Sequence, residues 1–365
     1  GYTSGRLPRL DRPMNTPLRD DPPFVLVDGS YFMFRAYHAL PPLQTSQGLH
    51  THAVRGAAMA LQKLIRRTQP THMAVVFDTP EPTFRHELSE FYKAHRPSMP
   101  GELSEQVPYL HALIRALGIP MLKLPGAEAD DLIGTLARRA CREGHHVLIS
   151  TGDKDMCQLV DDWIVLEDSF KEKTMDHAAV VEKFGVRPDQ IVDFLALMGD
   201  SSDGIPGIPR IGAKTAAKLL NQYDTMAGIL AHLDEIKGAV GQSLRDHQGD
   251  IPLNHQLATI VCDLPLTLDW HELRLGQPNV PELRRLYTEL EFRTLLQSLD
   301  HPNNPDNLAH QDQTRPRPPV TALAAPEAHS PVRPERPGQG LWHTILSEDR
   351  FAVLLSQLQS ALDQG

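Results

Sequence analysis

Nine acidic side chains fall in five short segments of this 365-residue chain. Seven of them lie in G-A-E-A-D-D (126–131), T-G-D-K-D (151–155) and G-D-S-S-D (199–203), and the other two close F-V-L-V-D (24–28) and M-A-V-V-F-D (73–78). Two like charges about 4 Å apart repel by about 1 kcal/mol in water and by about 4 kcal/mol at an effective dielectric constant of about 20. We therefore expect bound cations to neutralise this cluster, which consists of Asp28, Asp78, Glu128, Asp130, Asp131, Asp153, Asp155, Asp200 and Asp203.

The chemistry that such a cluster favours is divalent-metal catalysis. Mg²⁺ prefers hard oxygen ligands and keeps several waters, so a site built mostly from carboxylates suits it. Two such ions roughly 4 Å apart can activate a water molecule and stabilise the leaving oxygen of a phosphodiester. Glu128 and Asp131 share one face of a predicted helix, with Asp130 beside them in a first turn that favours acidic side chains. Ordinary helix caps and turn aspartates explain one or two of these carboxylates, but not all of them.

A glycine- and proline-rich stretch, G-D-S-S-D-G-I-P-G-I-P-R-I-G-A-K-T-A-A-K-L-L (199–220), continues directly from the last two aspartates. Its composition predicts a tight hairpin followed by a helix that begins near Ala213. Residues 204–220 hold three basic and no acidic side chains. Backbone N–H groups and cations in such a hairpin can bind a phosphate backbone without reading bases, although a plain turn between helices is the alternative. The candidates for DNA contact are Gly207, Arg210, Gly212, Lys214, Thr215 and Lys218.

A third segment, F-R-H-E-L-S-E-F-Y-K-A-H-R-P (84–97), mixes cations with aromatic side chains. Arg85, Lys93 and Arg96 alternate with Phe91, Tyr92 and two histidines. Aromatic rings can stack on bases and cations can hold phosphates in single-stranded nucleic acid. The acidic residues of the segment fit a solvated helix face equally well, so the composition alone leaves both interpretations open.

The elements that must position these residues alternate between strands and helices. Strands are expected at 24–28, 73–78, 120–124, 146–151 and 163–168, and helices at about 53–67, 104–117 and 128–143. Fully apolar strands that alternate with helices indicate an α/β fold with a parallel sheet covered on both faces. Ligands of such sheets bind beyond the carboxyl ends of the strands. Asp28, Asp78 and Asp153 fall at such ends and Glu128 opens a following helix, which predicts a single site.

Five regions are expected along the chain. An unstructured leader at 1–23 precedes the α/β core at 24–175, and a helical region follows at 176–300. Residues 301–340 hold nine prolines, which indicates a Pro-rich linker. Residues 341–365 have the pattern of a strand and an amphipathic helix, too little to fold alone, and are expected to open a further domain.

The overall composition restricts partners and compartment. The net charge of −10 argues on its face against a nucleic-acid partner, but the clustered carboxylates account for most of it and bound divalent ions would offset them. Cys141, Cys157 and Cys262 show neither even pairing nor metal-like spacing, which indicates a reduced, intracellular compartment. No apolar run approaches the roughly 18 residues of a membrane span, and no signal peptide is apparent.

Together these segments resemble the 5′-nuclease (5′-3′ exonuclease) domains of bacterial DNA polymerases I, members of the flap endonuclease family. The resemblance begins at V-D-G-S-Y-F-M-F-R-A-Y-H-A-L-P-P-L (27–43), includes the segments quoted above in the same order, and ends near L-E-F-R-T-L-L (290–296). It implies a PIN-like parallel-sheet nuclease core with a helical arch at about 80–105. It also implies a helical DNA-binding half that contains a helix–hairpin–helix at about 190–222.

The resemblance further implies a role for each candidate residue. The nine carboxylates would hold two or more Mg²⁺ ions directly or through water, with Mn²⁺ as a substitute and K⁺ as a further candidate at the hairpin. Asp130 would be catalytic, Arg85 and Lys93 would polarise the scissile phosphate, and Tyr92 and Arg96 would contact DNA, Tyr92 by stacking a base. The family usually has glycine where this chain has Arg210. A left-handed backbone there would cost a non-glycine residue on the order of 1 kcal/mol, and the side chain could add a phosphate contact.

The expected function is a metal-dependent, structure-specific 5′-3′ exonuclease or flap endonuclease. It would hydrolyse phosphodiesters at 5′ ends, nicks and flaps, and remove RNA primers as the N-terminal part of a DNA polymerase I in replication and repair. The implied partners are DNA with a 5′ flap, nick or RNA primer and the polymerase domains that this chain lacks, so polymerase activity is not expected from it. We also expect the protein to be a monomer in the cytoplasm that associates with the nucleoid and not with a membrane.

Two alternative functions remain to be weighed, and a third is disfavoured by a missing motif. A non-catalytic DNA-junction binder would lack some carboxylates, whereas every position of the pattern is filled here. A PIN-type RNase would share an acidic site at the strand ends, but the hairpin at 204–220 and the long helical region argue against it. A phosphatase of the haloacid-dehalogenase kind would need D-x-D after the first strand, where this chain has Asp28-Gly29-Ser30.

Overall fold

The computed structural model describes residues 21–300 together with residues 343 and 344. Nearly all of the expected leader, the whole expected linker at 301–340 and most of 341–365 lie outside the described residues. Within the described part, no helix combines the length and the apolar character that crossing a membrane requires.

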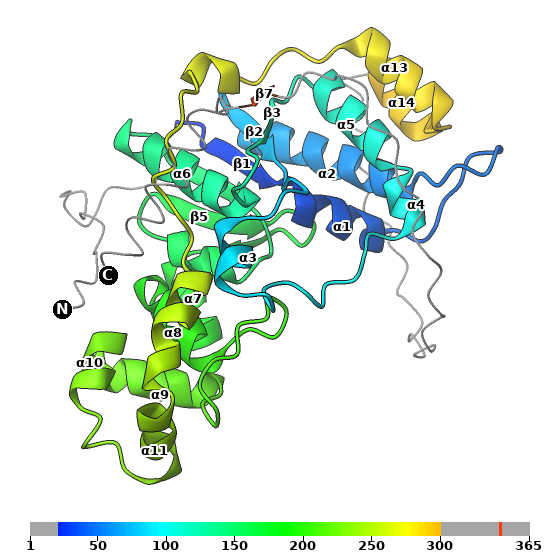
Figure 1. Cartoon of the computed structure of the whole chain (residues 1–365). Coiled ribbons are helices and arrows are strands. Elements are labelled where there is room, and N and C mark those ends of the chain that lie inside the picture. The colour runs from blue at the N-terminus through cyan, green and yellow to red at the C-terminus, as the bar shows by residue number, and fades with distance from the viewer. Residues whose placement is uncertain (1–20, 301–342, 345–365) are drawn as a thin grey trace.

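The centre of the fold is a seven-stranded sheet with the order β6-β5-β4-β1-β2-β3-β7 (Figure 1). All neighbouring strands are parallel except β6, which runs antiparallel to β5. The five predicted strands are confirmed, with ends that differ by one or two residues, whereas β6 was not predicted. The strand bounds are β1 Phe24–Asp28, β2 Met73–Val76, β3 Met121–Lys123, β4 Val147–Ser150, β5 Ile164–Asp168, β6 Lys173–Met175 and β7 His343–Thr344.

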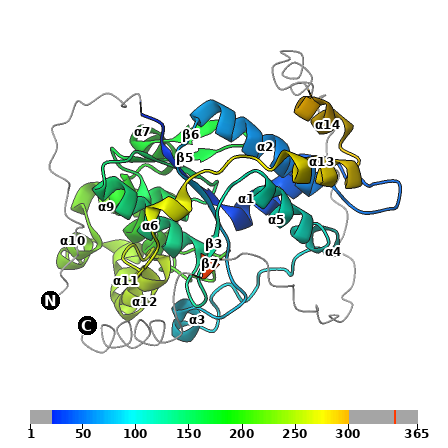
Figure 2. The same cartoon turned by 90° about the horizontal axis from the view of Figure 1, so that it is seen from above.

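Both faces of this sheet are buried, as the uniformly apolar strands require. Along β1, Phe24 and Leu26 belong to one apolar core, and Val25 and Val27 belong to the other. Successive side chains of a strand point to opposite faces, so each strand supplies both cores. Helix α6 covers the first face, and α1, α2 and α5 cover the second (Figures 1 and 2). Their bounds are α1 Gly29–Ala39, α2 His52–Thr68, α5 Val107–Ala116 and α6 Ala129–Arg142.

Helix α1 was not predicted, although its start has a clear cap. The Asp28 carboxylate accepts a hydrogen bond from the Tyr31 backbone N–H at 3.0 Å. A side-chain oxygen that accepts from an early N–H of a helix is a standard N-cap contact. One aspartate therefore closes β1 and opens α1, which fixes its carboxylate at the carboxyl end of the sheet.

The segment expected to form an arch contains two short helices, α3 (Phe84–Leu88) and α4 (Gly101–Ser104), and not one long helix. Between them lie a turn at 90–95 and an extended stretch. Figure 1 shows this connection passing from the region of the helical half to the end of α1.

The helical region divides into two parts. Helices α7 to α12 form a body at one end of the sheet, and α13 and α14 return to pack near α5 and α2 (Figure 1). Leu283, Leu286 and Leu295 of this returning pair belong to the same apolar core as α2 and α5. The bounds are α7 His177–Phe184, α8 Ile191–Met198, α9 Ala213–Tyr223, α10 Met226–Ala231, α11 Gly238–Asp246, α12 Ile251–Ala258, α13 Val280–Glu289 and α14 Arg293–Asp300.

Candidate metal and DNA site

Four aspartates gather at the carboxyl ends of adjacent parallel strands, and we call them the strand-end aspartates: Asp28, Asp78, Asp130 and Asp153. Asp28 ends β1, Asp78 lies two residues beyond β2, and Asp153 lies three residues beyond β4. Asp130 is in the first turn of α6, whose Ala129 N–H donates to Asp78 Oδ1 at 2.9 Å. The predicted convergence at one sheet edge therefore exists, because β4, β1 and β2 are neighbours.

These aspartates affect one another's protonation. Burial raises the pKa of Asp28 to about 7, and the charges of Asp78 and Asp153 add to the rise. Loss of solvent and the charges of Asp153 and Asp28 also raise the pKa of Asp130 well above its ordinary value. Within residues 21–300, none of the four forms an ion pair with a cationic side chain. Such a set gains stability from any added cation.

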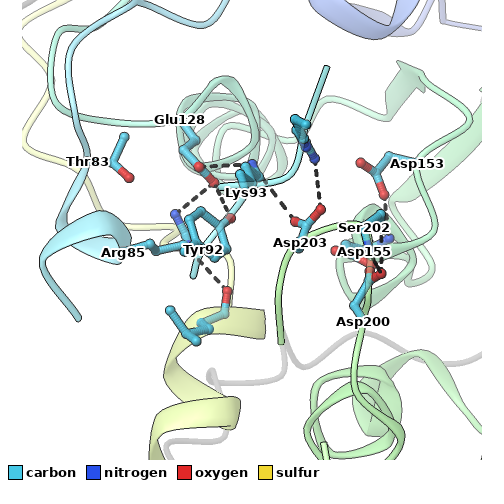
Figure 3. A network of polar contacts seen from close by, with 12 residues as sticks. Thr83, Arg85, Tyr92, Lys93, Glu128, Asp153, Asp155, Asp200, Ser202 and Asp203 are labelled. Atoms are coloured by element: carbon cyan, nitrogen blue, oxygen red, sulfur yellow. Dashed lines mark hydrogen bonds and ion pairs between the residues drawn. The ribbon is translucent and has the colours of Figure 1, made fainter. Parts of the chain in front are cut away.

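Four other carboxylates already have cationic partners, and we call them the cation-paired carboxylates: Glu128, Asp131, Asp200 and Asp203. Lys93 Nζ lies 2.9 Å from Glu128 Oε1, and Arg96 Nη2 lies 2.8 Å from Asp203 Oδ1. Lys154 contacts Asp200. Figure 3 shows Glu128 facing Arg85, Tyr92 and Lys93, with Asp203 next along and Asp200 beyond it. The segment at 84–97 therefore does reach the acidic site, but its cations contact protein carboxylates.

Arg85 and Asp131 form the most enclosed of these pairs, with 2% and 1% of their surfaces exposed. Two guanidinium N–H groups donate to the two Asp131 oxygens at 2.7 and 2.8 Å, and Arg85 also donates to the Leu257 and Thr259 carbonyls. Asp131 accepts a further bond from the Val261 N–H at 2.9 Å. In this structure both side chains join α3, α6 and the chain after α12, whereas the roles of Arg85 on a phosphate and of Asp131 on a metal ion stay predictions.

Tyr92 is also inside the protein, contrary to the expectation that it stacks a base. Its surface is 3% exposed, and its hydroxyl donates to Glu128 Oε2 at 3.0 Å. Burial, followed by the nearby Glu128 charge, raises the pKa of this phenol above its ordinary value. The ring presents no open face to a base in this structure, and its hydroxyl holds the Glu128 carboxylate, so base stacking by Tyr92 stays a prediction.

Two residues that the sequence reasoning did not single out complete the acidic site. The Thr151 hydroxyl donates to Asp28 Oδ2 at 3.0 Å and accepts from the Asp153 N–H at 3.1 Å, so it links two strand-end aspartates. Lys154 lies between Asp153 and Asp155 in the sequence and reaches Asp200. Both belong to T-G-D-K-D, and a hydroxyl and a cation inside an acidic motif were the available signal.

The loop after α8 connects the acidic site to the hairpin. Asp200 and Ile205 exchange backbone hydrogen bonds of 2.8 Å in both directions, which closes a tight turn that carries Asp203. Gly207 has a φ of +66°, and a Cβ there would lie 2.4 Å from the Gly199 nitrogen. Gly207 is buried and shapes this turn, and its contact with DNA stays a prediction.

The basic end of the hairpin is exposed, as predicted. Helix α9 begins at Ala213, and Arg210, Gly212, Lys214 and Lys218 lie on the surface, while Thr215 is half-buried. Arg210 has a φ of +68°, so the position does require the left-handed conformation that favours glycine. Its exposed guanidinium follows the Asp200–Asp203 turn by seven residues, which places phosphate-binding chemistry directly after the acidic site.

The residues present fit divalent metal ions, although the ligands must move to bind them. In the described part of the chain, no three acidic, histidine or cysteine side chains form a ready coordination sphere. Asp155 Oδ1 is nevertheless buried without a hydrogen bond, with the Lys154 ammonium 3.6 Å away, and burial raises the pKa of Asp155 to about 7. A donor set made only of oxygens, with mutually repelling aspartates and one orphaned oxygen, suits a hard cation such as Mg²⁺.

Known proteins match most of this chain in sequence. Residues 23–185 match the N-terminal resolvase-like domain of 5′-3′ exonucleases, and residues 186–281 match the C-terminal SAM fold of the same enzymes. DNA polymerase I of Pseudomonas aeruginosa is 48% identical over 285 residues, which make up 76% of this chain and 31% of that protein. The chain thus spans about a third of the length of this relative.

A shorter relative is matched over nearly its whole length. The 5′-3′ exonuclease of Aquifex aeolicus is 36% identical over 275 residues, covering 75% of this chain and 94% of that one. A bacteriophage T5 flap endonuclease, crystallised with DNA and metal ions, has the same fold with a TM-score of 0.56 at 19% identity, over 76% of this chain and 98% of that one. The predicted fold class is confirmed, and the chain belongs to the 5′-3′ exonuclease family of nucleases.

Proposed function

We propose that this nuclease is metal-dependent and structure-specific, and that it hydrolyses DNA at 5′ ends, nicks and flaps. The observation that carries the proposal is the direct connection between acidic site and hairpin. The turn that holds Asp200 and Asp203 continues into the exposed cations Arg210, Lys214 and Lys218. A backbone held by the hairpin would therefore lead a neighbouring phosphodiester to the carboxylates.

The metal ligands in this proposal are the strand-end aspartates together with Asp155, Asp200, Asp203 and Glu128. When bound, Mg²⁺ would polarise the scissile phosphate and make the attacking water more acidic. Asp28 is oriented for this by Tyr31 N–H and the Thr151 hydroxyl, and Asp78 by the first turn of α6. These bonds orient Asp28 and Asp78 before any ion arrives, and the remaining ligands would move toward the ion.

Lys93 is the proposed phosphate-orienting residue. Its ammonium lies 2.9 Å from Glu128 and 3.9 Å from Asp203, and its side chain is 15% exposed. Its φ of +53° is a strained conformation for a residue with a side chain, which is common at functional sites. Once cations neutralise the two carboxylates, this ammonium is free to donate to a phosphate oxygen. Arg96, whose side chain is half exposed, would act alongside it on the single strand.

The hairpin and α9 would bind the duplex through its backbone. The first N–H groups of a helix lack partners within the helix and attract phosphate, and Gly212 at this end has open space in front of it. Contacts of this kind position DNA without reading its sequence. The proposal extends to a monomer that acts as part of a longer DNA polymerase I and removes RNA primers, as the likeness to the Pseudomonas protein suggests.

The test is cleavage of a labelled 5′-flap duplex with Mg²⁺, with EDTA and with an Asp130→Ala protein. We expect a short 5′-phosphorylated product in the first case alone. Asp162→Ala is the matched control, because Asp162 is exposed and precedes β5 at the amino end of the sheet. Equal cleavage in all arms would disprove metal-dependent hydrolysis at this site, and tight binding without cleavage would favour a junction-binding protein.

A further inference from the structure

Two adjacent aromatic residues face opposite environments. Phe91 is 61% exposed, more than any other large apolar side chain of the described chain, whereas Tyr92 is 3% exposed. Single exposed apolar residues are common and need no explanation by themselves. Phe91 calls for an explanation because it lies beside the acidic site.

The backbone around Phe91 is held by several contacts. The Phe91 carbonyl packs so closely on Gly204 that a Cβ at that glycine would lie 2.1 Å from the Phe91 oxygen. The Lys93 N–H donates to the Asp203 carbonyl at 2.9 Å, and the left-handed φ of Lys93 turns the chain at this point. Phe91 is therefore presented from the junction between the acidic site and the hairpin.

The inward direction of Tyr92 fixes the outward direction of Phe91. The Tyr92 hydroxyl is bonded to Glu128, and the edge of its ring meets His86 with centroids 5.4 Å apart. Lys93 and Arg96 follow on the same turn and contact the carboxylates at its base. An exposed ring followed by two cations is a surface that matches a nucleotide, with its apolar base and its charged phosphate.

We propose that Phe91 is the platform on which an unpaired base of the 5′ single strand stacks. The inference rests on the proposed function and names the residue that recognises the unpaired strand. The neighbouring cations attract either a nucleotide or an acidic peptide, but a flat exposed ring beside them matches a stacked base, whereas an acidic peptide would use the cations alone. Tyr92 serves the same recognition indirectly by holding Glu128.

The experiment uses a flap duplex with 2-aminopurine as the first unpaired nucleotide, in Ca²⁺ so that binding can be followed without turnover. Stacking on an aromatic ring quenches this base. We expect wild-type protein to quench it, Phe91→Ala to abolish the quenching and weaken flap binding on the order of 5- to 100-fold, and Phe91→Trp to restore both. Tyr92→Phe should retain the quenching. Affinity for a nicked duplex without a flap should not change in Phe91→Ala, because it offers no unpaired base.

Phe34→Ala is the matched control, since Phe34 on α1 is also exposed, at 37%, and precedes the site in the chain. Unchanged quenching in Phe91→Ala, or an equal effect of Phe34→Ala, would overturn the proposal. Equal loss of nicked and flapped duplex binding would also overturn it, because the role would then be structural. Failure of the wild-type protein to cleave flaps would disprove the proposed function instead, and that result is read in the separate Mg²⁺ assay.

Discussion

The strand-end aspartates and the cation-paired carboxylates lie in one site but in opposite electrostatic states. In the first set, burial and neighbouring carboxylates raise the pKa of Asp28 to about 7. In the second, burial opposes ionisation of Asp200, but the contacts with Lys154 and Ser202 together outweigh it and the pKa of Asp200 is lowered. Within residues 21–300 the first set forms no ion pairs, whereas the second already has cationic partners. The difference separates carboxylates that need metal ions from those that must exchange a partner to bind one.

The paired set is itself divided by exposure. Arg85 and Asp131 are almost wholly enclosed, so their pairing is part of the core. The side chains of Lys93, Lys154 and Arg96 are 15%, 32% and 50% exposed. These three can leave their carboxylates without bringing a buried charge out of a closed interior. We therefore expect metal ions to compete with Lys93, Arg96 and Lys154 for their carboxylates, and phosphate to bind the cations so released. We do not expect this exchange at Arg85.

The largest expected effect concerns the enclosed pair. Asp131→Asn removes the bidentate partner of the buried Arg85 guanidinium and leaves it with Glu128, 3.1 Å away, which should lower the free energy of unfolding by about 3 kcal/mol. Urea denaturation of the metal-free protein measures this, with Asp162→Asn as the surface control. The double variant Arg85→Met/Asp131→Leu should recover much of the loss, because neutral packing replaces the pair. Wild-type stability with lost cleavage in Asp131→Asn would instead return Asp131 to the metal ligands.

Asp130→Asn, the matching substitution one residue earlier, should not destabilise the fold as Asp131→Asn does. Asp130→Asn removes a charge from a set whose members repel, so the metal-free protein should be at least as stable as wild type. Its cleavage rate should fall about 10²–10³-fold, since a proposed ligand of the metal ion that stabilises the reacting phosphate is lost. Single-turnover cleavage and urea denaturation on the same preparation check both parts. A loss of stability similar to that of Asp131→Asn would contradict the division into two sets.

The neighbouring residues Asp130 and Asp131 show how much of the fold and of the site could be predicted from the sequence. The strand ends follow from apolar runs that close on aspartates, and the parallel order of β4, β1 and β2 brings those ends together. Nothing local distinguishes Asp130 from Asp131. Their difference comes from Arg85, which lies 46 residues away and is placed by α3 packing on α12. Tyr92 and Phe91 were indistinguishable for the same reason, because one turn decides which ring is buried.

Metal-free stability should depend on pH through the strand-end aspartates. The folded pKa of Asp28, about 7, is above the unfolded value of about 4, so folding favours its protonated form. That contribution is present below about pH 4 and is lost as pH rises through about 7. The melting temperature of Asp28→Asn should therefore exceed that of wild type by an amount that grows between about pH 4 and pH 7 in EDTA. A constant difference across this range would show that Asp28 does not titrate there.

A smaller effect, on metal affinity, should appear on substitution of Lys154, the cation that contacts the proposed metal ligand Asp200. Lys154→Met removes a competitor from Asp200, so metal affinity should rise on the order of tenfold or less. Calorimetric titration with Mn²⁺ measures it. Lys171→Met is the control, because Lys171 pairs with Asp168 outside the nine carboxylates and is 61% exposed. Weaker metal binding would mean that Lys154 positions Asp200 and does not compete for it.

The smallest effect extends the comparison from carboxylates to their cations. Arg85 is buried and paired with a protein carboxylate. Arg210 is exposed and, within residues 21–300, has no ion-pair partner. Arg210→Gly relieves the left-handed φ of +68°, which should stabilise the fold by about 1 kcal/mol. If its charge contacts a phosphate, the same change reduces the slope of log affinity against log salt by about 1. Arg210→Lys separates the two effects, because it keeps both the charge and the strain. A variant that is stabilised without any change in salt dependence would show that Arg210 occupies a glycine position at a cost in stability and contributes no contact to DNA.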